Sequence, residues 1–177
     1  MAKEYTYFAG TLPMQFFGEK PAMSLDAFDA DAARLTDAVT AELLQKVELY
    51  TEDTANFPEA VKKFYDFETS LRNTLLDLRK KVRSDAGDFK RSNPDFYSEI
   101  AAAAAQAFNN PDLLEAEKIL DRLRWNALDN FGAGHYTDFT ALAFYRIKIA
   151  ILSKYIDRTP EKGNAALENI LDAVMAE

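Results

Sequence analysis

The sequence NFPEAVKKFYDFETSLRNTLLDLRKKVR, residues 56–83, decides the fold of this chain. Its apolar residues recur at alternating spacings of four and three, which predicts one long amphipathic helix with a continuous apolar face. Asn56 can cap this helix, and Pro58 fits its first turn, where a missing N–H group costs nothing. The helix would be about 40 Å long, so other helices must cover its apolar face. The residues of this face are Phe57, Val61, Phe64, Glu68, Leu71, Leu75, Leu78 and Val82.

Glu68 is the one charged residue on that apolar face. A buried carboxylate is costly unless it is paired, so Glu68 needs a cationic partner. Arg72 follows at the favourable i,i+4 spacing, and Arg146, in another strongly apolar segment, is the candidate partner from a second helix. Two arrangements remain open: a partly hydrated salt bridge at the edge of the face, or a buried ion pair that fixes the register of the helices.

The rest of the chain repeats helical patterns and has no useful run of period-two alternation, so we expect an all-α, multi-helix bundle. Ser24 and Thr36 are the expected caps of the next two helices, and Gly132 is an expected left-handed helix end. The last helix would turn Leu167, Ile170, Leu171 and Val174 inward. The expected helices lie at 25–35 and 37–50, after Asn93-Pro94-Asp95, from Leu113 to Phe131, from Thr137 or Asp138 to Ile156, and after Thr159.

Residues 1–23 are expected to form an irregular N-terminal arm, because glycine and proline punctuate this segment. Its aromatic side chains either pack on the body or form part of a surface for a partner. They are Tyr5, Tyr7, Phe8, Phe16 and Phe17. We expect the whole chain, 1–177, to be a single helical domain, in which 24–84 and 94–177 could form two lobes.

A basic segment begins in the last turns of the long helix, and it stands out because the chain as a whole carries a net charge of -8. Its cations either decorate a helix C-terminus, where they are favourable, or dock onto an acidic partner. They are Arg79, Lys80, Lys81, Arg83, Lys90 and Arg91. The acidic balance elsewhere disfavours a nucleic-acid partner.

Composition limits the location and the chemistry of this protein. The most apolar segment, 139–152, is too short and too charged to span a bilayer, and no signal-peptide pattern opens the chain, so we expect a cytoplasmic protein. There is no cysteine and only one histidine, His135, and the Glu-x-x-His spacing of helical metal sites is absent. We therefore expect no metal, no cofactor and no catalytic activity. The remaining enzymatic hypothesis would use Glu68 and its neighbours as acid–base groups in a helical pocket.

Several segments together resemble a bacterial family of unknown function that is encoded among V-type ATPase subunit genes. The matching segments are YFAGTLP at 7–13, MSLDAF at 23–28, FYxFExxLRNxLxxLR at 64–79, GHY at 134–136 and LxxYRxKxxIL at 142–152. That family is distantly similar to the helical C/d family of V-type ATPase subunits. Members of the C/d family are longer and have three helical lobes, so their docking geometry does not carry over.

The resemblance implies a helical, non-catalytic adaptor that links parts of the rotor or stalk of a V-type (A-type) ATPase. Such a protein would have ATPase subunits as partners, would not insert into the membrane itself, and would be peripheral to it through the complex. The alternative is a free-standing helical dimer, or a small-ligand-binding bundle, in which the face from Phe57 to Val82 pairs between chains.

Overall fold

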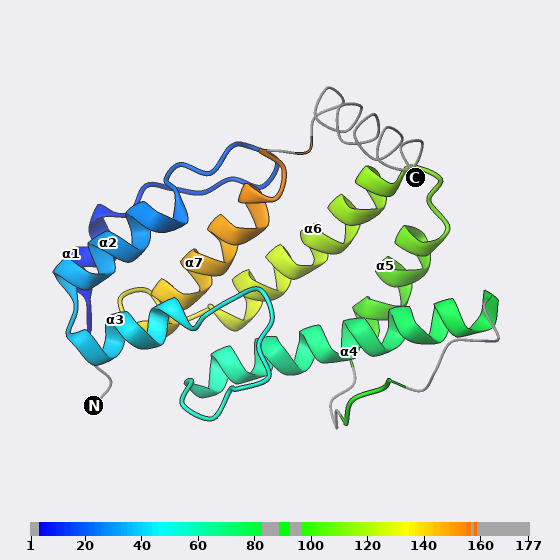
Figure 1. The fold of residues 1–177 in the computed structure, drawn as a ribbon, viewed down its shortest axis with the longest axis horizontal. Helices are drawn as coiled ribbons and strands as arrows, with labels where there is room; N and C mark the ends of the chain where they lie inside the picture. Colours follow the sequence, from blue (N-terminus) through cyan, green and yellow to red (C-terminus); the bar gives the residue numbers. More distant parts are fainter. Residues whose placement is uncertain (1–3, 83–88, 93–96, 157, 159–177) are drawn as a thin grey trace, which may run out of the picture.

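The structure is a computed structural model and describes residues 4–82, 89–92, 97–156 and 158. These residues form seven α-helices and no β-strand, so the expected all-α fold is confirmed. Arg83, the start signal at 93–95 and the expected helix after Thr159 lie outside the described residues. The helices are α1 (Thr6–Thr11), α2 (Leu25–Leu35), α3 (Ala38–Gln45), α4 (Glu59–Val82), α5 (Ser98–Phe108), α6 (Leu113–Phe131) and α7 (Phe139–Ser153) (Figure 1).

Side-chain caps start four of these helices. Ser24, Asp37, Asp112 and Asp138 each accept a hydrogen bond from a backbone N–H group in the first turn that follows, which satisfies donors left unpaired by the helix. The cap of α3 is therefore Asp37, and the expected cap, Thr36, is wrong. The hydroxyl of Thr36 instead donates to a carbonyl in the last turn of α2.

Helix α3 ends at Gln45, five residues before the expected end. The N–H groups of Lys46 and Val47 bond three residues back, which tightens the chain into a turn. Val47 then turns into the core, and its carbonyl accepts a hydrogen bond from Arg146. The chain has left the helix here, and this side-chain donor satisfies a carbonyl that has no helical N–H partner.

The N-terminal arm is more regular than expected, because it contains the short helix α1. Phe8 on this helix is 1% exposed and packs against the ring of Phe28, with ring centroids 5.3 Å apart. The N–H group of Tyr5 bonds to the carbonyl of Thr137, which ties the start of α1 to the start of α7. The arm is thus part of the folded body.

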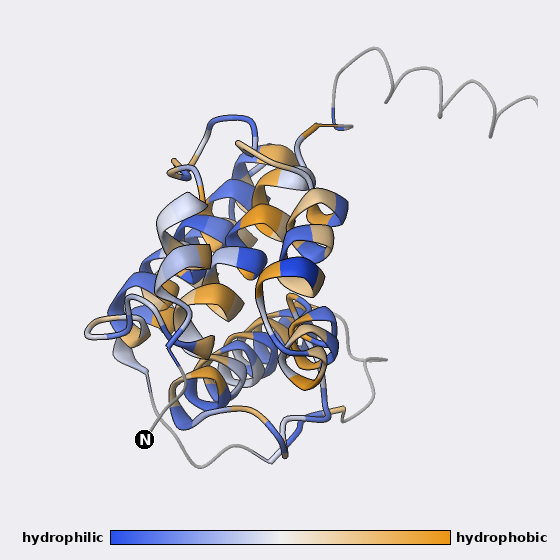
Figure 2. Cartoon of the chain, turned by 90° about the vertical axis from the view of Figure 1, so that its left-hand side faces the viewer, coloured by the Kyte–Doolittle hydropathy of each residue, from blue (hydrophilic) through white to orange (hydrophobic). Residues whose placement is uncertain are grey.

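The long helix α4 packs against α5, α6 and α7. Its apolar face is buried from Phe57, just before the helix, to Leu71, and beyond Leu71 the face is only partly covered. Most helices carry both an apolar and a polar side (Figure 2). Because helices of the same chain already cover the face as far as Leu71, this part is not available for pairing between chains.

Helix α7 is buried on most of its surface, as its sequence predicted. It packs against α2 and α3 as well as α4 and α6. One continuous cluster of buried residues therefore joins the described parts of the segments 24–84 and 94–177, the two possible lobes of the single expected domain.

The end of α6 also differs from expectation. Gly132 follows the helix with φ of -79°, so it is not left-handed; the left-handed residue is Gly134, with φ of 90°. A side chain at Gly132 would place a Cβ atom 2.8 Å from the carbonyl oxygen of Leu128 and 3.2 Å from the ring of Phe144. Glycine is needed here because a Cβ atom would collide with the last turn of α6 and crowd the ring from α7.

Arg146 joins α7 to α2 and to the turn that follows α3. Its guanidinium donates to both carboxylate oxygens of Asp29 on α2, at 2.9 Å each, and to the carbonyl of Val47. A planar fork of N–H groups fits this two-point contact, and the point charge of lysine does not.

We predict that Arg146→Lys lowers the free energy of unfolding by about 1–3 kcal/mol, because lysine keeps the charge but cannot make all three bonds. Arg34→Lys is the control, since the Arg34–Asp31 pair is exposed. Chemical denaturation measures both. Equal effects of the two substitutions would contradict a structural role for the buried fork.

Candidate functional site

Glu68 lies in the buried centre of the molecule and is bound by two arginines. Its side chain is 0% exposed. Arg72 donates to it from one turn later on α4, at 2.9 Å, as the sequence predicted. Arg124, on α6, donates through Nε at 2.8 Å and through Nη2 at 3.0 Å. The partner from the second helix is therefore Arg124 and not Arg146, and the ion pair is the buried one of the two expected arrangements.

The network continues from Arg124 to Asp121, one turn earlier on α6 and also 0% exposed. Arg124 donates to Asp121 at 2.8 Å, and beyond the end of α7 Lys154 and the hydroxyl of Tyr155 donate to the same carboxylate, at 2.9 and 2.6 Å. One chain of charge-assisted bonds thus connects α4, α6 and the end of α7. Among the described residues, no buried side-chain N or O atom lacks a partner.

Charge neighbours and burial set the protonation of this network. Burial disfavours the charged guanidinium of Arg124, but Glu68 and Asp121 outweigh this effect and raise its pKa above the usual value. Burial raises the pKa of the Tyr155 phenol, and its hydrogen bond to Asp121 raises it further. Tyr155 therefore stays a hydrogen-bond donor well into the alkaline range.

Sequence reasoning missed Arg124 and Asp121, although a signal was present. Arg124 lies four residues after Leu120 and four before Leu128, so it shares the apolar face of α6. A cation inside an apolar face is as unusual as a carboxylate there. The two unusual charges, Glu68 on one apolar face and Arg124 on another, could have been predicted to pair with each other.

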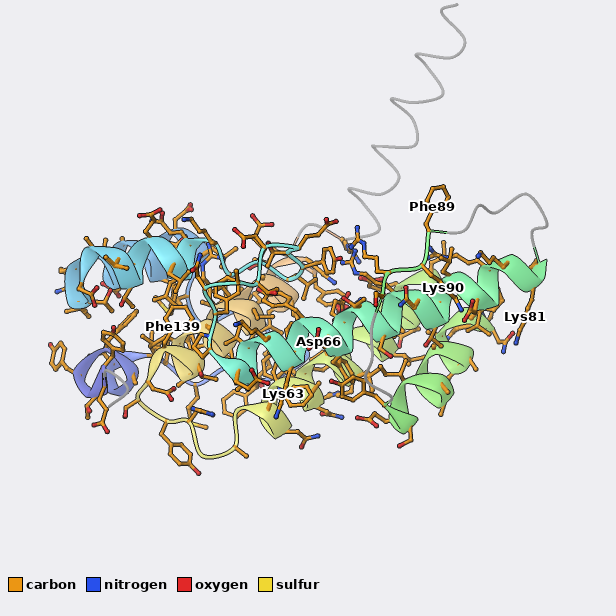
Figure 3. The ribbon with its side chains drawn as sticks, turned by 90° about the horizontal axis from the view of Figure 1, so that it is seen from below. Lys63, Asp66, Lys81, Phe89, Lys90 and Phe139 are labelled. Carbon is orange, nitrogen blue, oxygen red and sulfur yellow. The ribbon has the colours of Figure 1, made fainter. Side chains whose placement is uncertain are left out.

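The basic segment is only partly open to a partner. Arg79 and Lys81 are exposed at the end of α4, whereas Lys90 pairs with Asp77 at 2.8 Å. Arg91 pairs with Glu52, and its backbone is held by the side chain of Asn73. Figure 3 shows Lys81 at the far end of α4 and Lys90 on the segment that runs back along it.

The N-terminal aromatic residues do not form one surface. Phe8 is buried, which corrects its expected place on a partner surface, and the hydroxyl of Tyr5 bonds to Asp37 and Thr40. Tyr7 and Phe16 are exposed. Helix α1 and the basic end of α4 lie at opposite ends of the molecule, so these aromatics and the basic segment are not brought together (Figures 1 and 3).

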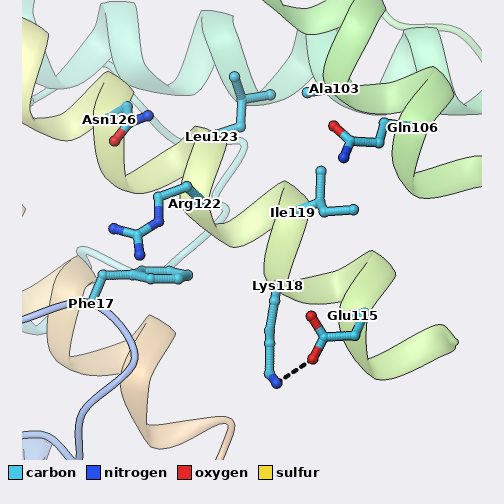
Figure 4. A pocket seen from close by; sticks show the side chains of 9 residues that line it. All are labelled: Phe17, Ala103, Gln106, Glu115, Lys118, Ile119, Arg122, Leu123 and Asn126. Carbon is cyan, nitrogen blue, oxygen red and sulfur yellow. Dashed lines mark hydrogen bonds and ion pairs between the residues drawn. The ribbon is translucent and has the colours of Figure 1, made fainter. Parts of the chain in front are cut away.

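Phe17 lines a groove beside α5 and α6, of about 490 Å³ (Figure 4). Its ring packs edge-on against Trp125 and lies under the guanidinium of Arg122, 3.8 Å from the ring centroid. Ile119 and Leu123 form the apolar part of the wall, while the rim carries Arg122 and the ion pair of Lys118 with Glu115. Such a groove can receive apolar side chains.

The hypothesis of acid–base chemistry at Glu68 fails on geometry, because both oxygens of its carboxylate are bonded to arginine and closed off from water. His135 bonds through Nδ1 to Asp138 at 2.5 Å. Within the described ranges, no group of three or more histidine, aspartate or glutamate side chains is arranged to hold a metal ion. In the same ranges, no helix has the length and apolar character needed to cross a bilayer.

No protein-family model, no curated protein and no solved structure matches this chain. The resemblance to the family encoded with V-type ATPase subunits therefore stays a prediction.

We predict that Glu68→Gln lowers the free energy of unfolding by about 3 kcal/mol, because it removes the charge that compensates buried Arg124. Glu42→Gln is the matched control: Glu42 and Lys46 form the same i,i+4 pair in an exposed position. Urea denaturation of both variants is the measurement. A stability loss at position 68 no larger than that at position 42 would show that the network contributes little.

A second prediction concerns alkaline pH. The folded state keeps the Tyr155 phenol protonated above pH 10, where a tyrosine in the unfolded chain loses its proton. The contribution of Tyr155 to the free energy of unfolding is therefore complete below about pH 10 and declines as the pH rises further. Tyr155→Phe should make the free energy of unfolding less dependent on pH above pH 10. Tyr136→Phe, at an exposed tyrosine, is the control, and an equal change in the two variants would contradict the prediction.

Proposed function

We propose that this chain is a non-catalytic helical adaptor that links subunits of a bacterial V-type rotary ATPase on the cytoplasmic side. The observation that supports this most is the buried network of Glu68, Arg124 and Asp121. These charged groups hold helices together and are not exposed to a substrate. A body whose helices are held together by buried ion pairs can transmit force between partners, because close-packed interiors deform little.

The two ends of the molecule offer different contact chemistry, which suits a linker. One end presents Arg79 and Lys81 on the exposed last turn of α4. The other, where α1 meets the start of α7, presents Met14 and Tyr136, 74% and 78% exposed, which line one shallow pocket. The first surface fits an acidic partner, and the second fits an apolar one.

We predict that the tagged chain co-purifies with rotor or stalk subunits of the rotary ATPase from membranes of its source cell. If it links two parts, Arg79→Glu with Lys81→Glu should lose one group of these subunits and keep the other. Met14→Asp with Tyr136→Asp should do the reverse. Mass spectrometry identifies the subunits.

The control for charge reversal is Lys20→Glu with Lys46→Glu, two exposed cations that belong to neither surface. It should retain every subunit that the unmodified chain retains. An intact rotary ATPase that purifies without this chain, or surface variants that bind like the control, would refute the proposal.

A further inference from the structure

An apolar groove lies between the second half of α4, the end of α5 and the start of α6. Its volume is about 390 Å³, and Leu75 of α4 and Leu120 of α6 belong to its lining. Leu113, the first residue of α6, is 83% exposed at its edge, and Phe108 at the end of α5 is also exposed. Apolar side chains gathered in a surface groove indicate a docking site for another apolar surface.

The groove lies where the described helices no longer cover the apolar face of α4. On this face Leu71 is fully buried, whereas Leu75 and Leu78 are only partly buried and Val82 is 72% exposed. Apolar surface that is left in water gains free energy when a partner covers it. The second half of α4 therefore presents the continuation of the same apolar face to a partner.

The charge that the groove leaves for a partner is positive. Glu117, the carboxylate in its lining, is already paired with Lys154 at 2.9 Å. On the opposite side, Arg79 is exposed and contacts no carboxylate among the described residues, and Lys81 is exposed on the same end of α4. A partner with acidic side chains beside its apolar ones is electrostatically complementary to this groove, and a second copy of the basic surface would not be.

The elements around the groove favour a helix as the bound segment. Helices form its walls, and the described residues contain no sheet edge to which an extended segment could add as a strand. Ala107 and Ala116 lie in the lining, where their small side chains allow another helix to approach closely. An amphipathic helix binds such a groove through apolar side chains at i, i+3 or i+4, and i+7.

We propose that the groove between α4, α5 and α6 binds an amphipathic helix of a partner protein. The apolar side chains of this helix lie against Leu75, Phe108 and Leu113, and its acidic side chains lie beside Arg79. The inference rests on the proposed function for its basic surface, because Arg79 belongs to the surface that is assigned there to an acidic partner. It adds the form of the bound segment and the apolar contacts that hold it.

The test uses the full chain in its source cell, with the photoreactive amino acid p-benzoylphenylalanine in place of Leu113. This position is exposed, so the fold tolerates the change. On irradiation, the proposal expects a cross-link to another protein, in a segment with helical apolar spacing and flanking acidic residues, which mass spectrometry identifies. The same amino acid in place of Val39, 76% exposed in the first turn of α3, is the control and should not label this segment.

A second measurement tests the charge complementarity. Arg79→Glu should lower the yield of the cross-link about tenfold, because it puts a carboxylate beside the acidic side of the bound helix. Lys63→Glu is the matched control, since Lys63 is an exposed cation of the same helix, about 24 Å along it from position 79. It should leave the yield unchanged, and equal yields from the two variants would contradict the proposal.

The proposal is overturned if position 113 forms no cross-link, or cross-links only within its own chain or to a second copy. Its failure can be told apart from failure of the proposed function. An acidic helix cross-linked from a protein outside the ATPase would retain the groove assignment and count against the adaptor role. ATPase subunits that co-purify equally well with the unmodified chain and with Leu113→Asp would retain the adaptor role and refute the groove assignment.

Discussion

The interaction on which this structure depends is the contact of the Glu68 carboxylate with Arg72 and Arg124. A carboxylate removed from water is expensive, and the cost is offset only if several donors with good geometry surround it. Here three N–H groups within 3.0 Å meet the two oxygens. Because Arg124 also binds Asp121, which in turn holds Lys154 and Tyr155, the contact links α4, α6 and the end of α7.

This arrangement has a consequence for function. The side chains that would be the first candidates for acid–base chemistry are enclosed, whereas the exposed ends of the molecule carry cations at one end and apolar side chains at the other. Rigid bodies with separate contact surfaces suit linking roles, because a force applied at one end moves the other end with little internal deformation. The proposed adaptor role rests on this rigidity and on the separation of the two surfaces.

Features set by local sequence could be predicted, and features set by helix orientation could not. The apolar face of α4, the Ser24 cap and the Glu68–Arg72 pair follow from spacing along one helix, and the structure contains all three. The pairing of Glu68 with Arg124 depends on which face of α6 meets α4, and the hydrogen bond from Arg146 to the carbonyl of Val47 depends on how α7 lies beside the end of α3. The periodicity of apolar residues within one segment does not show how that helix is oriented relative to its neighbours. The sequence named Arg79 and Lys81, which the proposed basic surface keeps, but it could not show that the N-terminal aromatics lie at the opposite end of the molecule.

The two buried arginines also explain why this chain adopts one packing. Apolar stripes alone would allow neighbouring helices to rotate or slide, since one leucine can replace another at a contact with little change in free energy. Rotating α6 by one residue, about 100°, would turn Arg124 away from Glu68 and put Leu123 or Trp125 near a carboxylate whose remaining partner is Arg72. Arg146 imposes the same restriction on α7 through its two-point contact with Asp29. Each arginine therefore fits its carboxylate in one orientation of its helix. The polar contacts thus select among packings whose apolar contacts alone would give nearly equal free energies.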